Sequence, residues 1–305
     1  MTKLSFGWVA ILGLFVLGFS ACDDDDPVVN EPQTLSELVA DDDRFTTLLG
    51  ALESTGLDFT LNQPGPYTVF APTDAAFTAS GVDLTALSTD ELRNVLLYHV
   101  VSGAILPSNN IQEGITSVTS ANATGPNDTQ LSLLVERTGS DINVNGLNVT
   151  EADIEGSNGV IHVIDNVLLP PTVVDLAASV TPLSSLVDAI GAAADIDAST
   201  TVAGALSGDG PFTVFAPDNT AFAAAPSGLS AEQLRDVLLY HVVSGNVRSD
   251  AIPASAPTLN GEELSFSGTT ITTTSGQTVN ITFTDIQGTN GVVHLINAVM
   301  VPGDL

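Results

Sequence analysis

The chain has 305 residues, with 36 Asp and Glu against 6 Lys and Arg, which gives a formal net charge of -30. Nucleic acids and anionic membrane surfaces are bound through Lys and Arg, so this charge argues against both as electrostatic partners. Hydrophobic residues make up 44%, enough to fill a core, and the single Cys excludes an internal disulfide framework and a Cys-rich zinc site.

Residues 1–21 have the pattern of a secretory signal. Lys3 precedes an apolar run that begins at Leu4, and small residues end the run directly before Cys22. This ending resembles a bacterial lipobox, in which the Cys is lipidated and becomes the first residue of the mature chain. The alternative is an uncleaved transmembrane anchor with an incidental Cys. We expect residues 1–21 to be a lipoprotein signal peptide and the lipid on Cys22 to hold the chain at the membrane.

Residues 22–33 form a predicted acidic tether. Four consecutive acids, Asp23 to Asp26, stay hydrated and repel one another, and the segment shows no apolar periodicity. An acidic run after the lipidated Cys resembles a surface-export signal of some Gram-negative bacteria, whereas in others an Asp at this place indicates inner-membrane retention. We expect a lipid-anchored protein of the cell envelope, on the outer membrane and facing the exterior.

Three sequence blocks recur in the same order. PYTVFAPTDAAF (66–77) matches PFTVFAPDNTAF (211–222) at 8 of 12 positions, and LRNVLLYHVVSG (92–103) matches LRDVLLYHVVSG (234–245) at 11 of 12. GSNGVIHVIDNVLLP (156–170) matches GTNGVVHLINAVMVP (288–302) at 8 of 15, and the three offsets are 145, 142 and 132. Units of this length are domain-sized, so the pattern predicts two tandem domains, 34–171 and 172–305.

Each block carries signals for local structure. Tyr67 to Phe70 is a short β-prone run, and Thr73 follows where a helix N-cap belongs, with Asp218 at that place in the second copy. The stretches Ser88–Glu91 and Ser230–Gln233 are capping boxes that predict the start of a second helix in each unit.

Behind each capping box, an apolar helix face ends in a histidine. Leu92, Val95, Leu96 and His99 are spaced i, i+3, i+4, i+7, and the second copy repeats the spacing up to His241. We therefore expect both histidines to be buried. In the third block, an Asn-Gly turn opens a strand that is apolar on both faces, which predicts a strand covered on both sides. Thr-, Ser- and Val-rich stretches before it indicate hairpins.

The three blocks resemble the fasciclin-like domain, twice over and across nearly the whole of the expected mature chain. The resemblance implies an α+β fold of two tandem fasciclin-like domains, each a wedge-like β-sandwich flanked by short helices. It also implies a secreted or surface-anchored module for adhesion or matrix interaction that has no enzymatic activity.

The sequence favours a non-catalytic protein with no metal and no cofactor. All four histidines lie in the repeated blocks, and neither HExxH nor His-x-His spacing occurs, so buried structural histidines are favoured over a metal or catalytic site. No G-x-S-x-G elbow and no EF-hand loop is present. A Ser-His-Asp arrangement assembled in space stays open at this point, and the scarcity of Trp and Tyr disfavours a carbohydrate platform.

Two Tyr-His dipeptides are the candidate site residues: Tyr98-His99 and Tyr240-His241. In animal fasciclin-like proteins this segment is associated with integrin contact. We interpret the dipeptides as mainly structural, with a minor contact role left open, and expect Tyr98 to be partly exposed. The expected polar partners near the capped turn are Thr73 or Asp74 for His99 and Asp218 or Asn219 for His241.

The predicted function is that of a lipid-anchored cell-surface adhesion protein. Its expected partners are an extracellular protein or a matrix polysaccharide, with the membrane reached through the lipid on Cys22 and no nucleic acid bound. The alternative is an envelope lipoprotein that binds a small ligand or a polysaccharide. The acidic surface fits a saline host or ordinary surface acidity.

Overall fold

The structure, a computed structural model, describes residues 32–193, 202–206 and 208–303, which include all three repeated blocks in both copies. The predicted signal peptide, Cys22 and residues 22–31 of the tether lie outside the described residues, and the predictions made for them stand as predictions. Pro32 to Leu305 form one compact unit. Within the part of the chain that is described, every helix is too short or too polar to cross a bilayer.

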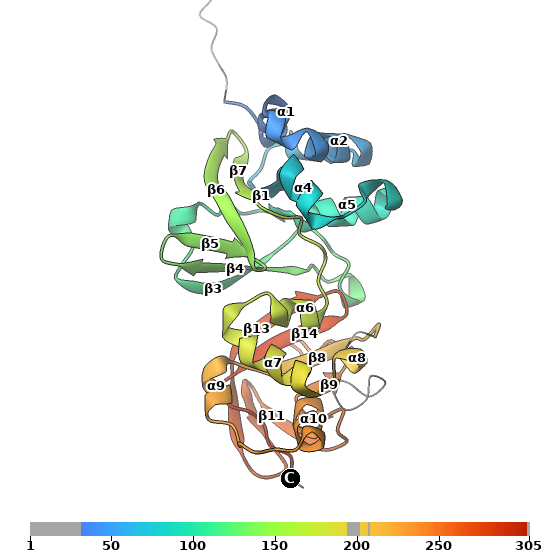
Figure 1. Cartoon of the computed structure of the whole chain (residues 1–305), viewed down its shortest axis with the longest axis vertical. Helices are drawn as coiled ribbons and strands as arrows, with labels where there is room; N and C mark the ends of the chain where they lie inside the picture. The colour runs from blue at the N-terminus through green and yellow to red at the C-terminus, as the bar shows by residue number, and fades with distance from the viewer. Residues whose placement is uncertain (1–31, 194–201, 207, 304–305) are drawn as a thin grey trace, which may run out of the picture. The chain divides into compact units, whose positions relative to one another are not determined.

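The first repeat combines short helices with a seven-stranded sheet (Figure 1). Its helices are α1 (Leu35–Asp41), α2 (Thr46–Thr55), α3 (Leu57–Leu61), α4 (Asp74–Ser80) and α5 (Thr89–Tyr98). Its strands are β1 (Tyr67–Pro72), β2 (Val100–Ser102), β3 (Gly114–Thr119), β4 (Ser132–Thr138), β5 (Asp141–Val144), β6 (Leu147–Gly156) and β7 (Gly159–Ile164).

The second repeat has the same plan. Its helices are α6 (Val173–Ala178), α7 (Ser184–Ala193), α8 (Val202–Leu206), α9 (Asn219–Ala223) and α10 (Ala231–Tyr240). Its strands are β8 (Phe212–Pro217), β9 (Val242–Ser244), β10 (Ser255–Pro257), β11 (Glu263–Ser267), β12 (Thr270–Thr272), β13 (Thr278–Gly288) and β14 (Gly291–Ile296). The tandem α+β architecture expected from the blocks is therefore confirmed.

Strand order is β2-β1-β7-β6-β5-β4-β3 in the first repeat and β10-β11-β12-β13-β14-β8-β9 in the second. The strands of the first and third blocks pair in parallel, β1 with β7 and β8 with β14, and every other pairing between the named strands is antiparallel. The hairpins expected between the second and third blocks are thus found as an antiparallel meander.

Local signals place these elements where the sequence predicts them. Thr73 and Asp218 cap α4 and α9, and complete capping boxes open α5 at Ser88 and α10 at Ser230. Strand β7 is buried at all six positions, as expected for a strand covered on both sides. It begins at Gly159, where a Cβ would lie 2.1 Å from the carbonyl oxygen of Tyr67, so only glycine allows this approach of β1 and β7.

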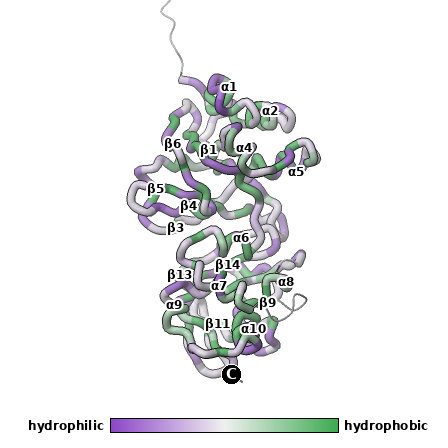
Figure 2. Tube along the Cα trace, viewed as in Figure 1, coloured by the Kyte–Doolittle hydropathy of each residue, from purple (hydrophilic) through white to green (hydrophobic). Residues whose placement is uncertain are grey.

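Each repeat has two apolar clusters, one on either side of its sheet. In the first repeat, one cluster joins α1, α2, α3 and α5 to β1 and β7, and the helices stand together beside those strands (Figure 1). The other joins β1, β2 and β7 to β4 and β5, so the two parts of the sheet face one another across Phe70, Tyr98 and Leu133. In Figure 2, hydrophobic and hydrophilic residues are interleaved along the elements, as a chain with two buried layers requires.

Candidate functional site

His99 is buried at the end of α5 and bonds only backbone groups. Its Nδ1 lies 2.8 Å from the carbonyl oxygen of Val95, and its Nε2 accepts a 2.9 Å hydrogen bond from the amide of Leu168. An accepting Nε2 places the proton on Nδ1, so the ring is neutral. Burial lowers the pKa of His99 to about 4, against the opposing effect of the bond to Val95. The ring therefore ties the helix end to the segment after β7.

His241 repeats this arrangement in the second repeat. Its Nδ1 bonds the carbonyl of Val237 at 2.7 Å, and its Nε2 accepts from the amide of Met300 at 2.9 Å. Burial again lowers the pKa to about 4, with the bond to Val237 opposing the shift. The burial expected for both histidines is found, since each is 2% exposed.

The partners expected for these histidines are wrong. Thr73 caps α4 by accepting from the amide of Ala76, and Asp74 accepts from the amide of Thr47. In the second repeat, Asp218 caps α9 and Asn219 accepts from the amide of Ser185. These side chains are already used by the helices around them, and a ring at a helix end lies within reach of the carbonyl four residues before it.

The expectation that Tyr98 is partly exposed is also wrong. Tyr98 is fully buried, and its hydroxyl donates to the carbonyl of Ser132 at 2.7 Å and accepts from Nδ2 of Asn145 at 2.6 Å. Position on the helix places Tyr98 away from the face that packs on α2, but β4 and β5 cover that other side. Tyr240 is buried as well, with a looser bond from its hydroxyl to Oγ1 of Thr274 at 3.3 Å.

A second histidine in each repeat joins a cluster that the sequence analysis missed. Asp153 lies in a bulge of β6 with φ of 62°, and its amide donates to Nδ1 of His162 at 3.3 Å. Its carboxylate accepts from the amide of Ser108 at 2.8 Å and from the hydroxyl of the same residue. Nε2 of His162 then bonds the carbonyl of Leu106 at 2.8 Å.

The second repeat builds the same cluster from Ser249, Asp285 and His294, with the carbonyl of Val247 as the last acceptor. The signal for it is in the sequence: the third block extends upstream to an Asp-Ile pair in both copies, at the same offset of 132. A positive φ outside glycine is favoured by Asp and Asn, so an aspartate repeated at that place indicates the bulge.

These clusters hold the residue types of a catalytic triad, yet their geometry does not form a proton relay. In a triad the imidazole bonds the hydroxyl with one nitrogen and the carboxylate with the other. Here the serine bonds the aspartate directly, and both ring nitrogens meet backbone groups. Burial lowers the pKa of His162, and the bond to Leu106 and the charge of Asp153 only partly oppose this. Among the described residues, no group of three or more His, Cys, Asp and Glu is placed to hold a metal ion.

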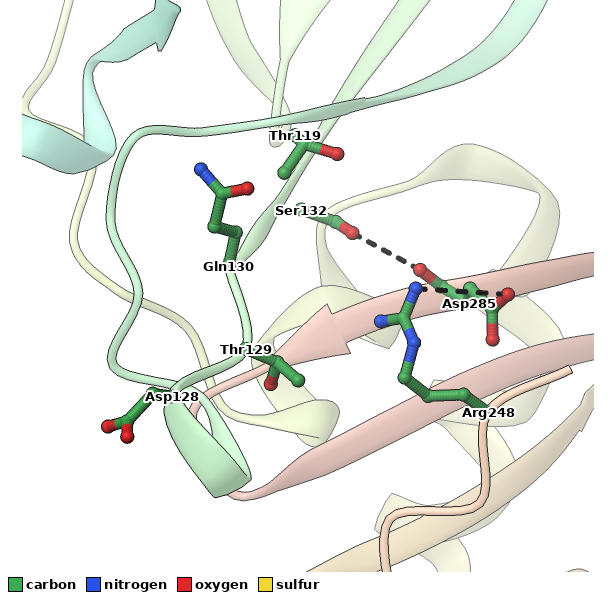
Figure 3. Close-up of a pocket in the computed structure, with 7 residues that line it drawn as sticks. All are labelled: Thr119, Asp128, Thr129, Gln130, Ser132, Arg248 and Asp285. Atoms are coloured by element: carbon green, nitrogen blue, oxygen red, sulfur yellow. Dashed lines mark hydrogen bonds and ion pairs between the residues drawn. The ribbon is translucent and has the colours of Figure 1, made fainter. Parts of the chain in front are cut away.

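A polar cavity of about 390 Å³ lies between the repeats (Figure 3). Its lining is polar throughout: Thr119, Asp128, Thr129, Gln130, Ser132, Arg248 and Asp285. Arg248 extends toward Asp285, 4.0 Å from its carboxylate, while Asp128 points away from that pair (Figure 3). Hydroxyl, amide and carboxylate groups in one cavity suit a hydrophilic occupant.

Ser132 holds the wall of this cavity and joins the repeats. Its hydroxyl donates to the carbonyl of Asp285 at 3.3 Å and accepts from the amide of Gln287 at 2.9 Å. Leu134, two residues along β4, packs into the apolar cluster of the second repeat. The carbonyl of Ser132 also accepts from Tyr98. Ser132 therefore connects the buried Tyr98 of the first repeat to the bulge at Asp285 in the second.

The profile of the Fasciclin domain matches residues 43–170 and again 183–302, which together are well over half of the chain. The chain belongs to the fasciclin domain family. Its two repeats are two fasciclin domains, and their blocks, strand order and buried motifs correspond throughout. Fasciclin domains are typically modules of adhesion and extracellular-matrix interaction, and the family's members are non-enzymatic adhesion domains.

Fasciclin relatives of this chain come from bacteria and animals. Protein sll1483 of Synechocystis sp. is 37% identical over 143 residues, which are 45% of this chain and 74% of that protein. Human periostin is 33% identical over 142 residues, 45% of this chain but only 16% of periostin. A solved fasciclin domain pair from the insect cell adhesion molecule Fasciclin I aligns with 86% of this chain and 98% of its own, with a TM-score of 0.51 and 18% identity. That structural likeness shows the fold.

Proposed function

We propose that this chain is a non-catalytic, lipid-anchored adhesion protein of the cell surface that contacts an extracellular protein or a matrix polysaccharide. The observation that carries the proposal is the tandem pair of fasciclin domains, the arrangement also found in an insect cell adhesion molecule. The internal use of the histidines supports it, because their ring nitrogens are engaged by the fold in both repeats.

The polar cavity between the repeats is the surface that we assign to this contact. Its hydroxyl and amide groups can exchange hydrogen bonds with a hydroxylated polymer or a polar protein loop, and water can bridge the remainder. The ion pair of Arg248 with Asp285 lies partly exposed at its edge. Such a pair contributes little to stability, and because Ser249 holds the Asp285 carboxylate, Arg248 is the member that can turn to a ligand.

The anchor rests on the sequence of the N-terminus. A lipid on Cys22 would place both fasciclin domains outside the membrane at the end of the acidic tether. Stable membrane attachment takes more than one hydrophobic chain, which the lipid of a bacterial lipoprotein supplies.

Two measurements on cells that produce the chain test the parts of this proposal separately. The Cys22→Ala variant should leave the membrane fraction or accumulate as an uncleaved precursor, while the wild type incorporates labelled fatty acid. Cells with the wild-type chain on their surface should aggregate or bind matrix more strongly than a deletion strain. Wild-type protein without lipid would refute the anchor, and equal aggregation of wild type and deletion strain would refute the adhesion function.

The alternative, an envelope lipoprotein that serves ligand uptake, makes the opposite forecast in the same strains. Deletion would then reduce uptake of a small molecule or polysaccharide and leave aggregation unchanged. The two readouts thus distinguish adhesion from uptake.

A further inference from the structure

A second cavity, of about 280 Å³, opens between α9 and α10 of the second repeat. Most of its wall is aliphatic or aromatic and includes Phe222, Ala225, Leu229, Leu234, Val237 and Leu238. Its polar members are Ser227, which is exposed, and His241. The cavity belongs to one repeat and is separate from the polar cavity between the repeats.

The first repeat shows why the cavity exists. The offset between the repeats falls from 145 to 142 between the first and second blocks, so the connection that precedes α10 is three residues shorter than the one that precedes α5. In the first repeat the longer connection forms a turn of 3-10 helix, Leu84–Ala86, and Leu84 packs against the apolar core. The shorter connection of the second repeat has one leucine, Leu229, where that of the first has two, Leu84 and Leu87, packed against the core.

The side chains beside the cavity are more exposed than their counterparts in the first repeat. Phe77 and Leu92 are buried in the first repeat, at 7% and 8% exposure. Their counterparts Phe222 and Leu234 are only partly buried, although both pack against the core of the second repeat. The second repeat thus has one leucine fewer in this connection, and the core beside it is less covered.

The chemistry of the wall decides what can enter. Both nitrogens of His241 are engaged by Val237 and Met300, so the ring offers no free hydrogen bond to a ligand. No residue of the wall carries a formal charge at neutral pH, because burial keeps His241 neutral. A charged ligand would lose its hydration here without gaining a counter-charge, whereas an apolar ligand loses nothing.

We propose that this cavity binds a small uncharged aliphatic molecule, which takes the place that Leu84 fills in the first repeat. The volume lies near the lower end of small-molecule sites, roughly 300–1,000 Å³. Apolar cavities of about half this size bind benzene in other proteins. The site does not depend on adhesion and would make the second repeat a sensor or carrier of an apolar compound.

Methyl NMR of the folded protein, titrated with 1-hexanol as the probe, tests the site directly. We expect saturable shifts confined to the methyl groups of Leu229, Val237 and Leu238, and at least tenfold weaker binding of hexanoate at pH 7. Unsaturable shifts, shifts spread over both repeats, or equal binding of hexanoate would overturn the proposal. This result stands on the wild-type protein and needs no variant.

Two variants then locate the site by loss and gain. Ala225→Leu adds an aliphatic group to the wall and should weaken hexanol binding at least tenfold, whereas Ala79→Leu, at an exposed position of α4, should leave it unchanged. Leu84→Ala should open a matching cavity in the first repeat and add shifts at Val95 and Leu96. Unfolding curves confirm that each variant is folded. A folded Ala225→Leu variant that binds hexanol as the wild type does would overturn the assignment.

Discussion

The two repeats have the same buried Tyr-His dipeptide and differ in the segments that contact it. Tyr98 and Tyr240 are equally buried, yet the hydroxyl of Tyr98 has two close partners that lead to the inter-repeat contact, whereas that of Tyr240 reaches the exposed Thr274. The connections before α5 and α10 differ as well, since the first brings Leu84 and Leu87 onto its core and the second lines a cavity. The Tyr-His dipeptide thus maintains the fold in both repeats, and the segments around it give each repeat its own surface.

The largest expected effect is one that the repeats share, a loss of stability on acidification. An unfolded histidine takes up a proton near pH 6.5, whereas His99 and His241 stay neutral in the fold down to about pH 4. Their stabilisation is complete above pH 6.5 and is lost as the pH falls toward 4, by about 3 kcal/mol for each ring. Urea unfolding at pH 7 and pH 4.5 measures the loss.

Conservative variants separate the contribution of His99 to the acid-induced loss of stability from that of His241. His99→Gln and His241→Gln should each be less stable than the wild type at pH 7 and show a smaller loss between the two pH values. Equal stability of the wild type at pH 7 and 4.5 would contradict neutral, buried rings. Burial also lowers the pKa of His162 and His294, so a variant that combines both substitutions should still lose some stability as the pH falls.

Substitution of the buried tyrosine should lower stability more in the first repeat than in the second. Tyr98→Phe leaves the buried carbonyl of Ser132 without its donor and should cost about 1–2 kcal/mol. Tyr240→Phe should cost about 0.5 kcal/mol or less, because water can replace its bonds to the exposed Thr274. Chemical denaturation of both variants gives the comparison, and equal costs would show that the two environments are energetically alike.

An effect no larger than that of Tyr98→Phe is expected at the contact between the repeats. Ser132→Ala removes the acceptor of the Gln287 amide and should cost about 1 kcal/mol, with the two repeats unfolding in more widely separated calorimetric transitions. Ser140→Ala, at an exposed turn of the same repeat, is the matched control.

Separate expression of residues 34–171 and 172–305 tests whether each repeat folds without the other. Each part should unfold cooperatively, because each holds its own apolar clusters. If neither part folds alone, the contact through Ser132 and Leu134 belongs to one merged core, and the description of two domains fails.

Features decided by neighbouring residues were predictable, and features decided by distant segments were not. Caps at Thr73 and Ser88 and the buried face that ends in His99 follow from spacings within one helix. The acceptor role of His99 toward Leu168 joins residues 69 positions apart, and the burial of Tyr98 depends on strands that come after it. The resemblance supplied the fold class but not these contacts.

The candidate site divides in the same way. The Tyr-His dipeptides could be found as a repeated motif, and their burial follows from helical periodicity for the histidines alone. The shortened connection near Leu84 was visible as a change of offset from 145 to 142. That it leaves a cavity beside Phe222 depends on how α9 and α10 pack, which no spacing along the chain records.

The central claim is that the Tyr-His dipeptides hold the fold and that adhesion depends on other surfaces. The most direct test is an aggregation assay on cells that display either the wild-type chain or the Tyr240→Phe variant at equal surface density. We predict equal aggregation at a temperature where both proteins are folded, since Tyr240 is buried and its hydroxyl bonds Thr274, which does not line the polar cavity. A folded variant that no longer supports aggregation would contradict the claim and place the adhesion site at the dipeptides.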